Sequence, residues 1–182
     1  MKREWIELMK KSGKLKLTFW ENTSHYLIVV FLFIPLILSI YGFFEYYITK
    51  TYTGVRTPFE MFNVSYPFAF LGLLFYFIQN NRLKFKVIQT NLSKEKLLEI
   101  IKETGNELEW RTEKKTNDYF INVTNPKWCS GSWGERITII IDNNRILINS
   151  ICDPDKKSSV ISAGRNKKNV NTLIQNIKKA SC

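Results

Sequence analysis

A cluster of serine, glycine and basic residues is the part of the sequence whose side chains best suit ligand chemistry. Its members are Ser158, Ser159, Ser162, Gly164, Arg165, Asn166, Lys167 and Lys168. The apolar spacing that follows predicts a helix from about Asn166 to Lys179, so the cluster lies where that helix begins. A helix N-terminus already carries free N–H groups and partial positive charge, and extra cations there are unfavourable unless an anion offsets them. We therefore expect a site for a phosphate-type anion. A lipid-headgroup site and an ordinary solvated basic surface are the alternatives.

A second cluster combines glycine with two large aromatic residues between predicted strands. It runs from Trp128 to Gly134 and includes Trp133. Exposed tryptophans could stack on a base, contact a partner protein or enter the bilayer surface. We therefore expect an aromatic contact loop formed by Trp128 and Trp133. The alternative is that one or both of them cover the domain core.

Catalytic and metal-binding patterns are absent from the sequence. The chain has one histidine, His25, and three cysteines, which do not have zinc-site spacing. No phosphate-loop, dinucleotide-binding, zinc-protease or nucleophile-elbow motif occurs. Asp153 and Asp155 flank Pro154, a pattern typical of a turn rather than a catalytic carboxylate pair. The sequence therefore predicts a protein that is not an enzyme and has no metal or cofactor.

Two long apolar runs indicate how the chain is organised. Residues 22–44 and 61–81 contain no Asp, Glu, Lys or Arg, and a bilayer core of about 30 Å needs roughly 20 apolar residues of helix. We predict a basic interfacial segment over 1–21, a two-helix transmembrane hairpin over 22–81 with an outer loop 45–60, and a basic cytosolic domain over 82–182. A cleaved signal peptide and a buried helical hairpin of a soluble protein are the alternatives.

Charge distribution orients this hairpin. Residues 1–21 hold six basic and three acidic side chains, the loop 45–60 holds two of each, and residues 82–182 hold nineteen and eleven. Basic segments stay on the cytoplasmic side, so we expect a multi-pass protein of the inner (plasma) membrane with both termini cytoplasmic. The absence of charge inside the spans argues against a transporter. It does not exclude a pore made by several copies, because Ser39, Asn63, Ser65 and the small residues Gly42 and Gly72 could face one another.

The segment before the first predicted span contains two different sequence patterns. Trp5 and Met9 among basic residues predict a short amphipathic helix that lies on acidic lipid. From Lys14 to Phe19 polar and apolar residues alternate, which instead predicts a strand paired with the cytosolic domain.

For the cytosolic domain the sequence predicts an α+β fold, with helices packed on one side of an antiparallel four-stranded sheet in the order α-β-β-β-β-α. Ser93 is expected to cap a first helix that stops at Gly105. In the first predicted hairpin, Trp110 lies opposite Ile121 and Leu108 opposite Val123. In the second, the turn 143–144 places Ile141 opposite Ile146 and Ile139 opposite Ile148.

In layout and charge, although in no residue motif, the chain resembles the small two-span effectors of bacterial nucleotide-signalling defence systems. That resemblance implies a cytosolic sensor for a cyclic nucleotide and ligand-driven oligomerisation that damages the membrane. It assigns no residue.

We therefore expect a non-enzymatic membrane protein whose cytosolic domain binds a phosphate-rich anion and acts on the hairpin. Its partners would be a bilayer with acidic headgroups, the small anion and further copies of the chain. The alternatives are a membrane-anchored binding partner of another protein, such as an immunity protein against a membrane-active toxin, and a scaffold on acidic lipid.

Overall fold

The structure, a computed structural model, describes residues 3–125, 133–156 and 162–181. The chain forms two compact units. One unit combines residues 1–25 with residues 81–182, and the other contains residues 26–80. Each unit is described by itself below.

The first unit is built on an antiparallel sheet, to which the described residues contribute five strands. These are β1 (Lys86–Gln89), β2 (Trp110–Lys115), β3 (Tyr119–Thr124), β4 (Glu135–Asp142) and β5 (Arg145–Cys152), in the spatial order β1-β5-β4-β3-β2. The predicted antiparallel sheet with helices is confirmed, but the prediction of four strands is wrong. The missed strand is β1, which lies just after the second apolar run, where no strand was predicted. It is only four residues long and is held by pairing with β5, far away in the sequence.

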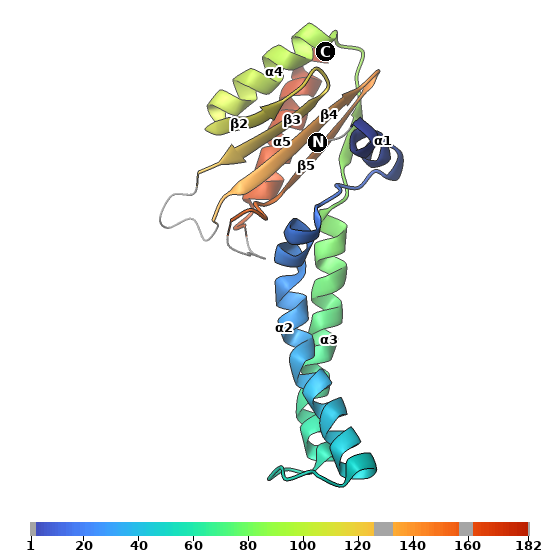
Figure 1. Cartoon of the computed structure of the whole chain (residues 1–182). Helices are drawn as coiled ribbons and strands as arrows, with labels where there is room; N and C mark the ends of the chain where they lie inside the picture. Colours follow the sequence, from blue (N-terminus) through green and yellow to red (C-terminus); the bar gives the residue numbers. More distant parts are fainter. Residues whose placement is uncertain (1–2, 126–132, 157–161, 182) are drawn as a thin grey trace. The chain divides into compact units, whose positions relative to one another are not determined.

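Two helices cover one face of the sheet (Figure 1). They are α4 (Lys94–Glu107) and α5 (Arg165–Ser181), and they pack on alternate residues of the central strands. The core combines Leu97, Ile100, Ile101, Phe120, Ile137, Ile139, Ile141, Ile146, Ile148, Val170, Leu173 and Ile177. Burial of such side chains stabilises the fold by about 1.5–3 kcal/mol each. This apolar layer fixes where α5 begins relative to β5, which positions the candidate site.

The two predicted hairpins have different outcomes. In β4–β5 the predicted pairs Ile141–Ile146 and Ile139–Ile148 are present, and Asn143 adopts a positive φ of 50° in the turn. In β2–β3 the predicted register is wrong, because Trp110 lies opposite Thr124.

The physical reason for the wrong register lies at the end of α4. Ser93 caps this helix as predicted, but the helix continues past Gly105 to Glu107, and Leu108 is its C-terminal cap. The strand therefore starts only at Trp110, and an irregularity between Thr112 and Lys114 shifts the rest of the pairing. A glycine near the end of a helical pattern did not mark the stop, since Gly105 is buried within the last turn.

The opposite face of the sheet is covered by the N-terminal segment. Helix α1 (Arg3–Ser12) packs against β4 and buries Met9 completely. After it, Leu15 N donates to Leu83 O at 2.8 Å and Phe85 N donates to Gly13 O at 2.9 Å, and a bridge joins Lys14 to Lys84. The segment thus contains both the helix and the extended pairing that the sequence offered as alternatives. Contact of α1 with lipid stays a prediction.

Asp142 joins α1 to the β4–β5 turn and gives a pH-dependent prediction. Its Oδ2 accepts a hydrogen bond from Arg145 Nε at 2.7 Å, and its Oδ1 lies 3.2 Å from Lys10 Nζ. Burial alone would raise the pKa of Asp142, but the hydrogen bonds from Arg145 and Lys10 hold that pKa below its usual value. A lowered folded-state pKa contributes stability above the unfolded pKa of about 3.9, and this contribution is lost as the pH falls through the folded-state pKa.

We therefore expect Asp142→Asn to lower the free energy of unfolding by about 0.5–1 kcal/mol near neutral pH, because the carboxylate is partly exposed. The cost of the substitution should shrink as the pH falls through the folded-state pKa of Asp142, since the wild-type carboxyl then becomes protonated. Urea unfolding of both proteins over a series of pH values from neutral to acidic measures the difference, and a cost that does not change with pH would contradict the role given to Asp142.

The second unit consists of most of two long helices joined by a short connection. Helix α2 (Phe19–Phe44) continues into the π-helix η1 (Glu45–Thr49), and α3 (Pro58–Arg82) returns beside it (Figure 1). Ser39 Oγ donates to Ser65 Oγ at 2.9 Å between the helices. A Cβ on Gly72 would lie 2.9 Å from a ring carbon of Phe33, so the glycine permits the close approach.

By length and composition, Phe19–Thr49 and Pro58–Arg82 are both able to cross a membrane. Only 17% of the most apolar window of each is buried within the structure. The core helix of a soluble protein would be mostly buried, so this exposure favours a membrane location over a buried soluble hairpin.

Candidate anion-binding site

The predicted basic cluster lies at the turn that leads into α5. Ser158 and Ser159 lie outside the described residues. Ser162 and Gly164 are in the turn, where Ser162 O accepts a hydrogen bond from Arg165 N at 2.9 Å. Gly164 is exposed, and with φ of 80° it has a backbone conformation that suits glycine. Helix α5 then begins at Arg165, so the basic residues occupy its first turn.

The structure divides these basic residues between two different hollows. Lys167 and Asn166 line a groove of about 200 Å³, whereas Arg165 and Lys168 line a cavity of about 280 Å³. Neighbouring positions on a helix point about 100° apart, which separates Lys167 from Lys168. The two hollows differ in electrostatic character.

The groove is strongly basic, and we call it the basic groove. Its described lining residues are Asn81, Arg82, Lys84, Lys86, Ile148, Asn149, Ser150, Asn166, Lys167, Val170 and Asn171. Four of these carry positive charge, and among the described residues that line the groove none is acidic. Serine and asparagine supply neutral hydrogen-bonding groups beside the cations. This combination suits a phosphate-type anion, because charged hydrogen bonds to phosphate are strong and several donors can share its oxygens.

Pairing of β1 with β5 brings the basic residues together. Lys86 lies opposite Ile148 on the face that α5 covers, so the start of β1 lies beside the first turns of α5. Asn149 of β5 contacts the segment just before β1: its Nδ2 donates to Arg82 O at 2.8 Å and to Lys84 O at 3.0 Å. The amide orientation follows from these two carbonyl acceptors. Asn149 therefore holds the backbone that carries Arg82 and Lys84 at the wall of the groove.

A chain of polar contacts fixes the start of α5 on the sheet. Ser150 Oγ donates to Asn166 Oδ1 at 2.8 Å, and Asn169 Nδ2 donates to Ser150 Oγ at 3.2 Å. Trp110 Nε1 then donates to Asn169 Oδ1 at 3.2 Å. Asn166, predicted as a ligand-binding residue, thus uses its side-chain oxygen to anchor the helix, and the anchoring sets the position of Lys167.

The second hollow has mixed charge. Arg165 and Lys168 line it together with Glu107, Glu109 and Glu135. Arg165 Nη1 lies 3.8 Å from the Oε2 of Glu135, whose side chain is 1% exposed and which also accepts a hydrogen bond from Thr124. An anion would meet three carboxylates here, so the arrangement suits Arg165 as a counter-ion for buried Glu135 rather than as an anion ligand.

The predicted aromatic contact loop is described only in part. Trp128 lies outside the described residues, while Trp133 has 52% of its surface exposed. Gly134 follows it with φ of 123°, and a Cβ there would lie 2.8 Å from Thr124 O, so this position requires glycine. Gly134 therefore permits the tight backbone turn that leads into β4.

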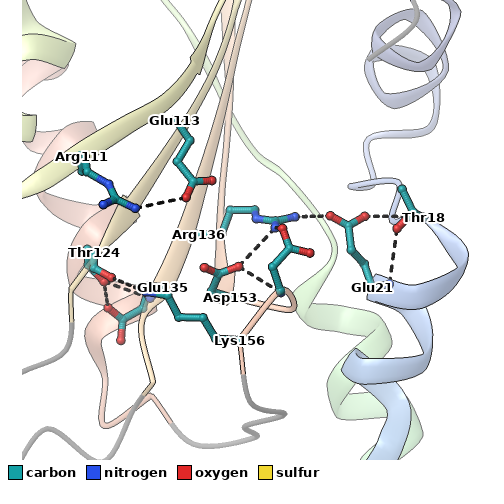
Figure 2. A network of polar contacts seen from close by, with 10 residues as sticks. Thr18, Glu21, Arg111, Glu113, Thr124, Glu135, Arg136, Asp153 and Lys156 are labelled. Atoms are coloured by element: carbon teal, nitrogen blue, oxygen red, sulfur yellow. Dashed lines mark hydrogen bonds and ion pairs between the residues drawn. The ribbon is translucent and has the colours of Figure 1, made fainter.

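Sequence reasoning missed a buried charge network on the opposite face of the sheet (Figure 2). Arg136, whose side chain is 7% exposed, contacts Glu21, Asp153 and Asp155. Burial alone would lower the pKa of Arg136, but these carboxylates raise that pKa above its usual value. Asp153 and Asp155 were predicted only to mark a turn. The available signal was Arg136 itself, a charged residue at the start of a strongly apolar strand.

Among the described residues, no group of three His, Cys, Asp or Glu side chains is placed to hold a metal ion. No protein-family model matches the chain, and no curated protein matches it either.

Proposed function

We propose that the chain is a non-enzymatic integral membrane protein whose basic domain binds a phosphate-bearing anion in the basic groove. The observation that supports this most directly is the convergence of Arg82, Lys84, Lys86 and Lys167 on one groove with no described acidic neighbour in its lining. Four like charges repel one another, and an anion with two or more charges would relieve that repulsion.

The proposed ligand is a small phosphate-rich molecule, such as a cyclic nucleotide. The groove of about 200 Å³ suits a phosphate-bearing part of the ligand, with the remainder outside. Ser150 and Asn171 add neutral polar groups to the lining.

The ligand would act on the membrane helices by shifting a population between two arrangements. Arg82 is the last residue of α3, and Lys84 and Lys86 follow it directly. An anion that binds these residues and Lys167 would favour the arrangement in which they are closest. In this proposal the protein lies in the inner (plasma) membrane with both termini in the cytoplasm, and oligomerisation of the helices is the output.

Titration of the full chain in detergent with inorganic pyrophosphate and with cyclic di-AMP tests the proposal. We expect saturable binding that weakens strongly between 0.1 M and 1 M salt, because the screening length falls from about 10 Å to about 3 Å. Absence of saturable binding of either probe at 0.1 M salt would contradict it. Native mass spectrometry of the same sample separates the alternatives. A stable complex with one protein and no anion supports an immunity-type partner, and retention of acidic lipid alone supports a lipid scaffold.

The protein-partner alternative has one observation in its favour. Strand β2 is an outer strand of the sheet, and five of its six residues are exposed. A partner strand could add to such an edge. Arg111, Lys114 and Lys115 together with the irregular pairing are, however, features that protect edges against added strands. The basic groove is therefore the stronger basis for a function.

A further inference from the structure

A third hollow, different from the two at the start of α5, lies within the first unit on the face of the sheet opposite α4 and α5. Its volume is about 410 Å³, which is within the range of small-molecule sites. The N-terminal segment forms one wall with Trp5, Leu15 and Leu17, and the strands form the other with Tyr119 and Ile121. We call it the N-terminal cavity. Most of its lining surface is apolar.

Two polar side chains in the wall of this cavity have atoms without partners. Arg136 is 6% exposed and Thr138 is 1% exposed. Within the described part of the molecule, Arg136 Nε and Thr138 Oγ1 take part in no hydrogen bond. They lie two residues apart on β4 and therefore on the same face of the strand. Buried polar atoms are almost always paired, so two orphaned donors beside one cavity require an explanation.

The charge around the cavity argues against an anionic occupant. The guanidinium of Arg136 is already matched by Glu21, Asp153 and Asp155. Lys16, Lys114 and Glu113 also line the cavity, so its other charges are of both signs. An anion would have to displace a carboxylate from Arg136, and a cation would meet Arg136 itself. Tyr119 contributes a neutral phenol, since burial raises the pKa of its hydroxyl to about 12.

We propose that the N-terminal cavity binds an uncharged, mainly apolar small molecule with a carbonyl-type oxygen that accepts hydrogen bonds from Thr138 Oγ1 and Arg136 Nε. The apolar body of the ligand packs on Leu15, Leu17 and Ile121, and its ring or chain lies beside Trp5. The ligand satisfies the two donors that the protein leaves unpaired. This site is separate from the basic groove, so the two proposals stand or fall independently.

Ligand-observed NMR on the full chain in detergent, with indole-3-carboxamide and indole-3-carboxylate as probes, tests the proposal. The two probes have similar shape and differ in charge, so we expect the carboxamide to bind and the carboxylate to bind at least tenfold more weakly. Thr138→Val should weaken carboxamide binding about tenfold, which is the loss expected for one hydrogen bond. Thr138→Ser, which keeps the hydroxyl, should retain binding. Leu17→Phe should abolish binding by filling the cavity.

A stability measurement on the same variants distinguishes a ligand site from a structural role. If Thr138 Oγ1 forms its hydrogen bond only with a ligand, Thr138→Val removes an unpaired buried hydroxyl from the ligand-free protein. The substitution should then raise the melting temperature of that protein by several degrees. If the hydroxyl instead had a structural role, Thr138→Val would lower the melting temperature. Three results would each overturn the proposal. They are equal binding of the two probes, no carboxamide binding at roughly 10 mM, a weak affinity even for such a fragment, and a lower melting temperature for Thr138→Val.

Discussion

The double substitution Lys84→Gln and Lys167→Gln is expected to weaken pyrophosphate binding about 100-fold at 0.1 M salt, because each lysine supplies one charged hydrogen bond worth about 1.5–3 kcal/mol. The two lysines come from different parts of the chain, the segment before β1 and the first turn of α5, and both line the basic groove. Both side chains are on the surface, so we expect the free energy of unfolding to change by less than about 0.5 kcal/mol. Isothermal titration calorimetry measures the affinity, and urea unfolding checks the stability.

Lys168 provides a matched control in the next position of the same helix. Lys168→Gln removes the same charge from the same turn of α5, but Lys168 lines the hollow that contains Glu107, Glu109 and Glu135. Combined with Lys84→Gln, it should weaken pyrophosphate binding only about tenfold, the loss expected for Lys84 alone. Equal losses for the Lys167 and Lys168 combinations would mean that net charge alone attracts the anion, and the groove would then be excluded as a specific site.

Arg136→Met is expected to lower the free energy of unfolding by about 3–5 kcal/mol, the cost of breaking a buried ion network by removing one partner. The substitution leaves Asp153, with a side chain only 3% exposed, without its cation. It also removes the link to Glu21 in the first turn of α2. Since domains are stable by only about 5–15 kcal/mol, this loss should lower the melting temperature by well over 10 °C. Thermal unfolding followed by tryptophan fluorescence measures the change.

Two variants show whether the cost comes from the buried network. Adding Glu21→Gln to Arg136→Met should restore about 1 kcal/mol or more, because one of the unpaired carboxylates disappears. Arg111→Met is the matched control, since Arg111 contacts Glu113 at 3.5 Å with 64% of its side chain exposed. An exposed pair of this kind contributes about 0–1 kcal/mol. If Arg111→Met proved as costly as Arg136→Met, burial would not be the source of the effect.

Local pattern was enough to predict the parts of the fold whose partners are close in sequence. The β4–β5 hairpin follows from alternating isoleucines around a two-residue turn, and the observed pairs match. Helix α5 follows from a single apolar stripe, and it spans nearly the predicted residues. Strand β1 was missed because Val87 and Ile88 are too few to form a pattern, and their pairing partner β5 is about sixty residues away in the chain.

The candidate site was harder to predict for a similar reason. The sequence presents Arg165, Lys167 and Lys168 as one cluster, whereas helical geometry sends Lys167 to one hollow and the other two to another. The partners of Lys167 in the basic groove come from the end of α3 and the start of β1, which the sequence marks only as basic residues after the second apolar run. Arg136 and Glu21 are 115 residues apart, so no local pattern could have joined them.

The hydrogen bond between Ser39 and Ser65 has a consequence for any ion conduction by this chain. With those two hydroxyls satisfied by each other, the paired helices present mostly hydrocarbon outward. If these two oxygens were to line a water-filled pathway between several copies, each copy would first have to separate its own serine pair and turn the oxygens toward water. Because each serine also contacts a carbonyl oxygen of its own helix, of Pro35 and of Phe62 respectively, both hydroxyls would keep a partner after the pair separates. In that case conduction would depend on a rearrangement within each molecule and not on assembly alone.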